Sequence, residues 1–459
     1  MTGKITVSAV LGALLIVAAP VAAQTPNNPF LGSAPQGTVS AEPLPLSLKD
    51  ALERALKYNL GLLLQEESMK AAHGARWRAL ASLLPNVSAS TSELRQVINL
   101  DAYGFPGEPS IIGPFNVFDA RVYLSQPVVD LRALNDARAA AANERAEKLG
   151  VRSARDLVTL VAVNLYLESV AASSRTEAAH AQQETAEALF KQASDMKQSG
   201  IVAGIDVLRA QVQLQNQRQR TISAENEYEK AKLQLARAIG LPAAQTFTLT
   251  DRIPYAPLPD VSLESALKTA FENRADYLAA RERLTAAEAS RRAAADDHLP
   301  TVHMDADYGT IGPTASDSHP TFRVAATLRV PIFDAGRSTG RRLESEAELN
   351  RRRAELEDFR GRVEYDVRAA LLDLRAASQQ LEAAQSNVTL AGQQLEQARD
   401  RYAAGVAVSL EVTQAQEAVA AASETFIGAL YAHNLAKASL ARAVGTAEQS
   451  VMSFLGGSR

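Results

Sequence analysis

The chain contains an internal duplication, and no other feature limits its possible folds as strongly. The segment LARAIG ends at Gly240 and returns as LARAVG, which ends at Gly445. Gly200 and Gly405 stand at the same offset of 205 residues, so the long segment between these markers is nearly equal in length in both halves. Such a repeat predicts two structural units built from helices of matched length.

The first part of each half repeats as well, with one difference in length. Pro85 meets Pro300 at an offset of 215 residues, whereas Pro127 meets Pro331 at an offset of 204. The first half therefore carries about 11 extra residues between Pro85 and Pro127. We expect this insertion to lie in one loop.

Composition excludes several classes of protein. Only 5% of the 459 residues are aromatic, and much of the 46% hydrophobic fraction is alanine, which suits helices that pack closely without large cores. The net charge of -4 gives no electrostatic argument for binding nucleic acid. The chain has no cysteine, which excludes disulfides, thiolate metal sites and a lipid-modified N-terminal cysteine. Any membrane attachment must therefore come from the fold.

The N-terminus has the pattern of a secretory signal peptide, which we place at residues 1–23. Lys4 precedes an apolar stretch from Ile5 to Ala19, and small residues follow Pro20. An uncleaved membrane anchor is the alternative, but the apolar run is shorter than the ~20 residues of a spanning helix. We expect no later apolar segment to have the length of a spanning helix. An exported chain of this kind is either soluble outside the cytoplasm or part of a membrane β-barrel.

Very long helical patterns follow in both halves. A helix is predicted from Ser47 to Leu84, where Pro85 ends it, and longer ones from Leu131 to Ser199 and from Arg337 to Ala404. About 67 residues at 1.5 Å each extend roughly 100 Å. After glycine-containing turns, second helices are predicted from Asp206 to Ile239 and from Glu411 to Val444. Helices of this length cannot wrap a compact core, so we expect them to pack as extended coiled pairs.

The order of these patterns divides the chain into six segments. They are the signal peptide (1–23), an irregular lead-in (24–46), a first repeat of helix, β-hairpin, long helix and helix (47–241), a proline-rich crossover (242–260), a second repeat (261–445) and a C-terminal tail (446–459).

Each half also contains strands in which apolar and polar residues alternate. In Thr301–Tyr308 and Thr321–Val330 one face is apolar and the other carries charge. The first half shows the same alternation over Phe118–Ser125 and less cleanly over Val87–Ile98. This period suits an outer-membrane barrel, and a half-buried strand of a soluble sheet is the alternative.

The number of strands bears on that choice. Two hairpins give four strands per chain, whereas the smallest bacterial barrels use about eight. Open sheet edges are not tolerated in lipid. A membrane location therefore requires several chains to share one barrel.

The sequence resembles a known family. The motifs are LPN at Leu84–Asn86, LP at Leu299–Pro300, QPVVD at Gln126–Asp130 and VPIFDAGR at Val330–Arg337, and in their order and spacing they are similar to those of TolC-type outer-membrane efflux channels. The similarity covers the chain from about Leu46 to Gly445. It implies a mainly α protein with a small β part, in which a homotrimer forms a twelve-stranded outer-membrane β-barrel above an α-barrel of twelve long helices.

The same resemblance implies a function and partners. The channel would be the exit duct of a tripartite efflux or type I secretion system in the outer membrane of a Gram-negative bacterium, with a long periplasmic extension. It would conduct substrates passively from an inner-membrane transporter of the RND or ABC type, through contacts with a periplasmic adaptor protein. Outer-membrane lipid is the other expected partner, and no nucleic acid or cofactor is expected.

Two helix-turn-helix tips match the family's periplasmic tips, which close the tunnel and dock against the adaptor. By position, Asp206 and Glu411 match acidic gate residues, Tyr402 matches an aromatic gate residue, and Gln414 stands where the family has a second aspartate. The resemblance assigns adaptor docking to Gly200, Ile201, Val202, Ala203, Gly204, Gly405, Val406, Ala407, Val408 and Ser409. A ring of carboxylates at a constriction would favour cations. The alternative is that Asp206 and Glu411 are acidic residues favoured at helix N-termini by the macrodipole, and both roles can hold together.

The sequence departs from the family pattern at the tips. Ala407 replaces an arginine that would link the helices, and Ile205 replaces a threonine beside Asp206. Our hypothesis is that closure relies more on packing at the tip than on ion pairs.

Enzymatic function is not expected, and we assign no catalytic or metal-binding residue. The chain has six histidines. The only cluster of possible metal ligands surrounds Pro300 and consists of Asp296, Asp297, His298, His303 and Asp305. His298 would lie at a helix end and His303 would face the barrel interior, so a metal shared by both is not expected. Asp305-Ala306-Asp307 lacks the rest of a calcium loop, and neither a phosphate-binding loop nor a nucleophile motif is present.

Two non-enzymatic alternatives to the channel are a soluble periplasmic coiled-coil adaptor or scaffold, and a passive porin. An adaptor needs no lipid-facing hairpins, and a porin would place most of its mass in strands.

Overall fold

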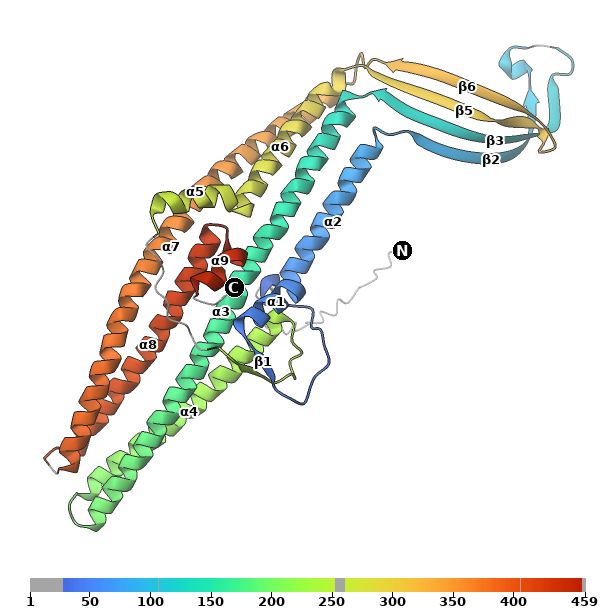
Figure 1. The fold of residues 1–459 in the computed structure, drawn as a ribbon. Helices are drawn as coiled ribbons and strands as arrows, with labels where there is room; N and C mark the ends of the chain where they lie inside the picture. Colours follow the sequence, from blue (N-terminus) through green and yellow to red (C-terminus); the bar gives the residue numbers. More distant parts are fainter. Residues whose placement is uncertain (1–27, 106, 252–260, 405, 456–459) are drawn as a thin grey trace, which may run out of the picture.

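The computed structural model describes residues 28–105, 107–251, 261–404 and 406–455. The signal peptide at 1–23, the crossover residues 252–260 and Gly405 of the predicted docking tip lie outside these ranges. Figure 1 shows an elongated molecule, with a layer of strands at one end and the turns of long helix pairs at the other.

Four long helices make up most of the molecule. They are α3 (Leu131–Gln198), α4 (Gly204–Ile239), α7 (Arg337–Ala403) and α8 (Ser409–Ala443). Their bounds confirm the long helices predicted from the sequence to within two residues at each end. In Figure 1, α3 runs beside α4 and α7 beside α8 down to the tips.

The helix pairs have narrow seams. Small buried side chains recur every seven residues on α3 and on α7, which is the period of a coiled coil: Ala179, Ala186, Ala193, Ala384, Ala391 and Ala398. Alanine at these positions lets neighbouring helices approach closely, as the composition predicts.

The predicted single helix from Ser47 to Leu84 is wrong, because the structure has two helices there. They are α1 (Leu48–Tyr58) and α2 (Leu60–Ala81). Asn59 separates them with an extended backbone (ψ 129°) and caps α2, since its side chain accepts hydrogen bonds from the backbone N–H groups of Gly61 and Leu62. In the second half, Arg274 separates α5 (Leu263–Asn273) from α6 (Ala275–Ala295), also with an extended backbone (ψ 111°) but without a side-chain cap.

The glycines that mark the repeat have a clear structural role. Gly240 and Gly445 adopt left-handed backbone conformations (φ 74° and 76°) where α4 and α8 end. A Cβ at Gly445 would lie 2.6 Å from the backbone nitrogen of Arg274. The repeated glycine therefore allows the helix end to approach the break between the two shorter helices.

Two apolar cores lie near the middle of the molecule, the first built mainly from residues of the first half and the second from residues of the second half. The first surrounds Tyr166, whose hydroxyl donates hydrogen bonds to the Leu46 carbonyl (3.1 Å) and to Asp251 (3.0 Å). It lies beside a two-stranded parallel pair, β1 (Leu44–Leu46) with β4 (Phe247–Leu249). The second surrounds Val363, Val367 and Leu440. A last helix, α9 (Ala447–Phe454), packs against α8 and α3.

The strand layer is one antiparallel sheet in the order β2-β3-β5-β6, with β2 and β6 at its edges. The strands are β2 (Asn86–Asn99), β3 (Ile111–Val129), β5 (Thr301–Thr314) and β6 (Asp317–Arg329). They confirm the predicted strands and extend them. The predicted insertion is the connection between β2 and β3, residues 100–110, which contains a short 3-10 helix at Asp101–Tyr103. The corresponding connection between β5 and β6 consists of residues 315 and 316.

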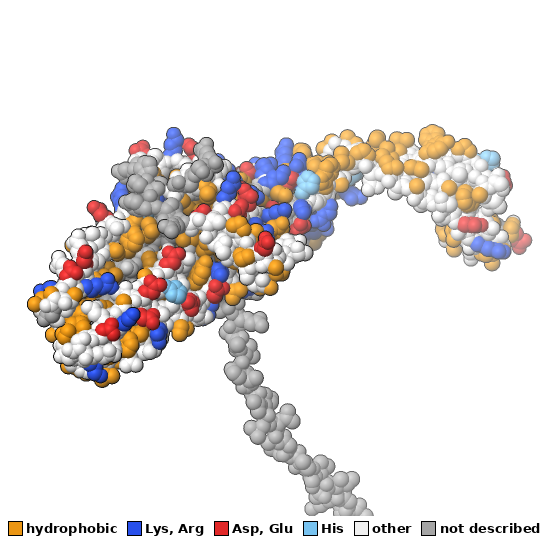
Figure 2. Space-filling view, turned by 60° about the horizontal axis from the view of Figure 1, so that its bottom comes forward, with side chains coloured by type: hydrophobic (Ala, Val, Ile, Leu, Met, Phe, Trp, Pro, Cys, Tyr) orange, Lys and Arg blue, Asp and Glu red, His pale blue; other side chains and the backbone are white. Residues whose placement is uncertain are grey.

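The two faces of the sheet differ in chemistry. On one face, Tyr308 pairs with Phe322, and Phe322, Val324 and Leu328 are exposed apolar side chains. On the other, Asp307 accepts hydrogen bonds from Arg121 and Arg323. Figure 2 shows hydrophobic side chains along one side of the strand layer. The sheet thus has the apolar and charged faces that the alternation predicts.

Among the described helices, α3 alone contains an 18-residue window that is long and apolar enough to cross a membrane. The expectation that no segment after residue 23 would meet this test is therefore wrong. However, 61% of the window is buried inside the structure. Burial of this extent is typical of a helix that packs in a protein core.

Candidate functional site: the helical tips and the cleft above them

The two tips lie at the same end of the molecule (Figure 1). The structure starts α4 at Gly204 and α8 at Ser409, each two residues before the predicted start. Asp206 and Glu411 consequently both lie in the first turn of a helix, where a carboxylate interacts favourably with the helix dipole. The helix-terminal interpretation of these residues thus holds in this structure, and it is compatible with a gate role.

One hydrogen bond links the two halves at the tips. The Ser409 hydroxyl donates to the Asp206 carboxylate at 2.6 Å. Arg209 also approaches Asp206, at 3.5 Å, from the next turn of α4. Sequence reasoning assigned Ser409 to adaptor docking and missed this contact, because the two residues are 203 positions apart.

Glu411 has an ion-pair partner that could not be predicted from the sequence. Arg401, near the end of α7, lies 3.6 Å from the Glu411 carboxylate. Both side chains are about half exposed (59% and 44%), so the pair contributes little to stability. This pair stands near the position where Ala407 replaces the family's arginine. Gln414 is exposed, and its side chain makes no hydrogen bond with the other described residues.

Tyr402 lies in the hydrophobic cluster that packs the tips together. It is 5% exposed and packs with Ala398, Val412 and Ala415, with Leu189 and Met196 of α3 beside them. Its hydroxyl has no hydrogen-bond partner among the described residues. Burial, and then the nearby charge of Asp206, raise the pKa of Tyr402, so the hydroxyl stays neutral. Packing is therefore the main contact between helix pairs here.

The turns themselves expose apolar side chains. Ile201 and Ile205 at the first tip are 65% and 52% exposed, and Val406 and Val408 at the second are 69% and 59% exposed. Gly200 takes a left-handed conformation (φ 75°) that starts the first turn. The other described docking residues divide into two groups: Ala203 and Gly204 are exposed, whereas Val202, Ala407 and Ser409 are half-buried.

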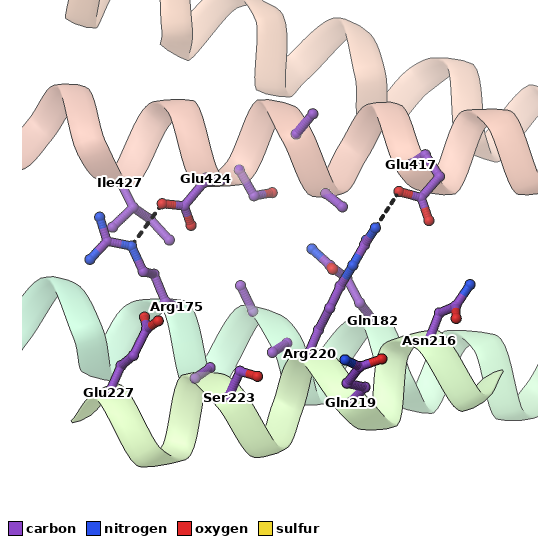
Figure 3. A pocket seen from close by; sticks show the side chains of 16 residues that line it. Arg175, Gln182, Asn216, Gln219, Arg220, Ser223, Glu227, Glu417, Glu424 and Ile427 are labelled. Atoms are coloured by element: carbon purple, nitrogen blue, oxygen red, sulfur yellow. Dashed lines mark hydrogen bonds and ion pairs between the residues drawn. The ribbon is translucent and has the colours of Figure 1, made fainter. Parts of the chain in front are cut away.

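A cleft of about 900 Å³ lies between α3, α4 and α8, above the tips (Figure 3). Two ion pairs cross it. Arg175 of α3 lies 2.8 Å from Glu424 of α8, and Arg220 of α4 lies 2.9 Å from Glu417 of α8. Sequence reasoning did not identify these residues, since each pair joins positions about 200 residues or more apart.

Glu417 is the better anchored of the two carboxylates. It also accepts a hydrogen bond from the buried Gln213 amide, at 2.6 Å. Burial alone would raise the pKa of Glu417, but the hydrogen bonds from Gln213 and Arg220 outweigh it and hold the pKa below its ordinary value. The carboxylate is therefore charged at neutral pH, and it ties α8 to α4.

The acidic cluster near Pro300 serves to join helices. Asp296 accepts a hydrogen bond from the Asn135 amide at 2.6 Å, and Asp297 pairs with Arg132 (3.1 Å) and Arg341 (3.2 Å). In the part of the chain that the structure describes, no three His, Asp or Glu side chains gather as a metal site.

Glu144 of α3 forms a second acidic anchor, which sequence reasoning also missed. Its side chain is 2% exposed and contacts Lys148, Arg76 and His73 at 2.8, 2.8 and 3.1 Å. Hydrogen bonds from Lys148, Arg76 and His73, in that order, lower the pKa of Glu144 to about 2. Two of these partners belong to α2, so the cluster fixes α2 against α3.

We expect Glu144 to make the fold sensitive to acid. Because its folded pKa is depressed, its stabilising effect is complete above its ordinary pKa of 4.5 and is lost as the pH falls towards 2. The partners are about half exposed, which limits the effect to about 1 kcal/mol. Thermal unfolding at pH 6 and pH 3 should show a smaller acid loss for Glu144→Gln than for the parent. Glu67→Gln, in an exposed pair, is the control and should behave like the parent. Equal acid losses in all three proteins would contradict the assignment.

Comparison with known proteins adds independent information. A family model described as outer membrane efflux protein matches residues 266–446. The chain is 24% identical to the outer membrane protein TolC of Vibrio cholerae over 433 residues, which is 92% of this chain and 96% of that protein. It is 25% identical to the pyoverdine export outer membrane protein OpmQ of Pseudomonas aeruginosa, over 88% of this chain and 86% of that protein.

Solved structures share the fold. A membrane protein from Pseudomonas aeruginosa superposes with a TM-score of 0.78 at 21% identity, covering 90% of this chain and all of that one. The Campylobacter jejuni CmeC outer membrane channel superposes with a TM-score of 0.74 at 18% identity, covering 87% and 86%. These likenesses extend over both halves of the chain, beyond the region that the family model matches.

Proposed function

Because the chain belongs to the TolC-type outer membrane efflux protein family, we infer that it is the outer-membrane exit channel of a tripartite efflux or type I secretion system. It conducts substrates passively from an inner-membrane pump across the periplasm and the outer membrane. The protein lies in the outer membrane of a Gram-negative bacterium, and its helices extend into the periplasm. We propose that it acts without catalysis.

One structural observation carries this proposal. A sheet with an exposed apolar face and two unpaired edges lies at one end of helices that are roughly 100 Å long. If the sheet lies in lipid, the edge strands β2 and β6 must each form backbone hydrogen bonds with another strand. Three copies, each giving four strands, would close a twelve-stranded barrel, and we propose this homotrimer.

The relatives have different cargoes. One is named for pyoverdine export, and a 22% identical one is an alkaline protease secretion protein, AprF, of Pseudomonas aeruginosa. Because relatives of this chain are named for pyoverdine export and for alkaline protease secretion, we propose that the pump selects the cargo of this channel. The pump would be of the RND or ABC type, joined through a periplasmic adaptor that docks on the exposed apolar turns at Ile201 and Val406.

The proposal is tested by fractionating membranes from cells that express the tagged protein, followed by size analysis of the detergent extract. We expect a heat-stable trimer in the outer membrane. A soluble periplasmic monomer or dimer would contradict the channel and favour a scaffold protein.

We propose that the tips form the periplasmic gate, closed mainly by packing around Tyr402 and assisted by the carboxylates. In planar bilayers, Tyr402→Ala should raise conductance several-fold because it removes the apolar contact between the helix pairs. Asp206→Ala should raise it less, through loss of the Ser409 hydrogen bond. Glu411→Ala should chiefly weaken cation selectivity.

Asp195→Ala is a matched control, because Asp195 is an exposed carboxylate near the first tip whose side chain forms no ion pair with other described residues. It should conduct like the parent. If Glu411→Ala conducted and selected ions like the parent, the carboxylate part of the gate would be wrong. If Tyr402→Ala did so, the packing part would be wrong.

A further inference from the structure

The segment between β6 and α7 carries the two most exposed large apolar side chains of the described residues. Ile332 is 95% exposed and Phe333 is 89% exposed. They follow Val330, which is 51% exposed, at the base of the sheet. Neighbouring large apolar side chains exposed to this extent indicate a surface that contacts another phase or another molecule.

This segment continues the apolar face of the sheet. Phe322, Val324 and Leu328 alternate along β6 on the face that would contact lipid in an outer-membrane protein. Val330 is the next residue in that alternation. Ile332 and Phe333 consequently lie where the apolar face ends and the long helices begin, at the level expected for the boundary between lipid tails and headgroups.

Positive charge follows directly in the sequence. Arg337 and Arg342 lie in the first two turns of α7, are exposed, and form no ion pair with other described residues. Figure 2 shows Lys and Arg side chains gathered where the helices meet the strand layer. These two guanidinium groups are therefore available to a ligand.

Two of the acidic side chains nearby already have other partners. At the start of α7, the Asp334 side chain accepts hydrogen bonds from the backbone N–H groups of Gly336 (3.1 Å) and Ser338 (2.8 Å). Asp297 pairs with Arg132 and Arg341. Neither carboxylate pairs with Arg337 or Arg342, so both guanidinium groups can attract an anion.

We propose that Ile332, Phe333, Arg337 and Arg342 form an interfacial anchor for anionic phospholipid in the periplasmic leaflet. The apolar pair enters the edge of the hydrocarbon layer, and the two guanidinium groups bind the phosphates of the headgroups. Arg342 lies about 8 Å further along the helix than Arg337. The headgroup layer is about 5–7 Å thick. The long Arg342 side chain can still reach it, because arginine side chains extend towards the interface. The chain has no cysteine that could carry a lipid, so this anchor is made by the protein alone.

The apolar part is tested by depth measurement in bilayers that contain brominated phospholipids. Phe333→Trp is made in a Trp77→Phe background, since Trp77 is the only tryptophan in the chain. We expect its fluorescence to be quenched most by bromine near the headgroup end of the acyl chain. Tyr365→Trp in the same background is the control, because Tyr365 is 71% exposed and lies about 42 Å further along α7. It should not be quenched.

The charged part is tested by comparing phosphatidylglycerol binding in phosphatidylcholine bilayers. An arginine near an anionic surface contributes about fivefold in affinity, so Arg337→Gln with Arg342→Gln should weaken binding by up to about 30-fold. Arg353→Gln with Arg375→Gln is the matched control, since both arginines are exposed on the same helix, have no ion pair with described residues and lie further from the sheet. This control should bind like the parent.

Several results would overturn the anchor. An unquenched tryptophan at position 333 would show that another copy of the chain or the solvent covers this segment. Equal binding by the two double variants would remove the role of the arginines. The inference rests on the proposed channel function, and single-channel conductance of the same preparation separates the two. Absence of conductance would contradict the channel, whereas conductance without quenching would contradict the anchor.

Discussion

Replacing Gly445 with alanine should lower the free energy of unfolding by about 3 kcal/mol. Gly445 has φ 76°, a conformation that costs an L-residue about 1–2 kcal/mol. The new Cβ would also lie 2.6 Å from the nitrogen and 2.7 Å from the Cα of Arg274, and backbone atoms at a helix break cannot easily move aside. Overpacking of this kind adds roughly 1–3 kcal/mol.

The measurement is thermal unfolding of the detergent-purified protein, followed by circular dichroism. Gly392→Ala provides the control, because Gly392 is an exposed residue inside α7 with open space around its Cα. That change should be neutral or stabilise the protein by up to about 1 kcal/mol. Similar melting temperatures for the two variants would show that the contact at Gly445 does not limit stability.

The second large loss of stability should follow from removing the carboxylate partners of Arg274, whose side chain is 3% exposed. Its guanidinium donates to Asp276 at 2.7 Å and to Asp366 at 2.7 Å. Removing both carboxylates, by Asp276→Ala with Asp366→Ala, leaves a buried charge without these partners. We expect a loss of about 3–5 kcal/mol.

Adding Arg274→Met to that double variant should restore much of the stability, because it removes the buried charge. Asp358→Ala is the control for losing an ion pair, since Asp358 and Arg362 form an exposed pair at 2.9 Å. Its cost should stay below about 1 kcal/mol. Should the double variant melt like Asp358→Ala, the Arg274 cluster would be a minor contributor.

Local signals explain why the long helices could be predicted well. Asp130 caps α3 by accepting the backbone N–H of Ala133, and its counterpart Asp334 accepts the backbone N–H of Ser338 in the first turn of α7. Gly240 and Gly445 end helices because they adopt left-handed conformations. These are properties of short segments, and the duplication repeats them in both halves.

The parts that sequence reasoning missed depend on contacts between distant segments. The break at Asn59 has a local signal, since asparagine is a strong N-cap residue. The break at Arg274 has no such signal, since arginine is not an N-cap residue, and one of the two partners of its side chain, Asp366, is 92 residues away. Ser409, Arg220 and Glu144 likewise acquire their roles from partners on other helices, so only the structure reveals them.

The order of the sheet makes the strand layer depend on the number of copies present. Along β2 and β6, each chain leaves a row of backbone N–H and C=O groups without partners in the sheet, and each such group costs several kcal/mol in hydrocarbon. A single copy thus has no stable place in a bilayer. Folding of this layer and association of the chains should be one event, whose equilibrium shifts with protein concentration. Dilution alone would then favour release of the strands from the membrane.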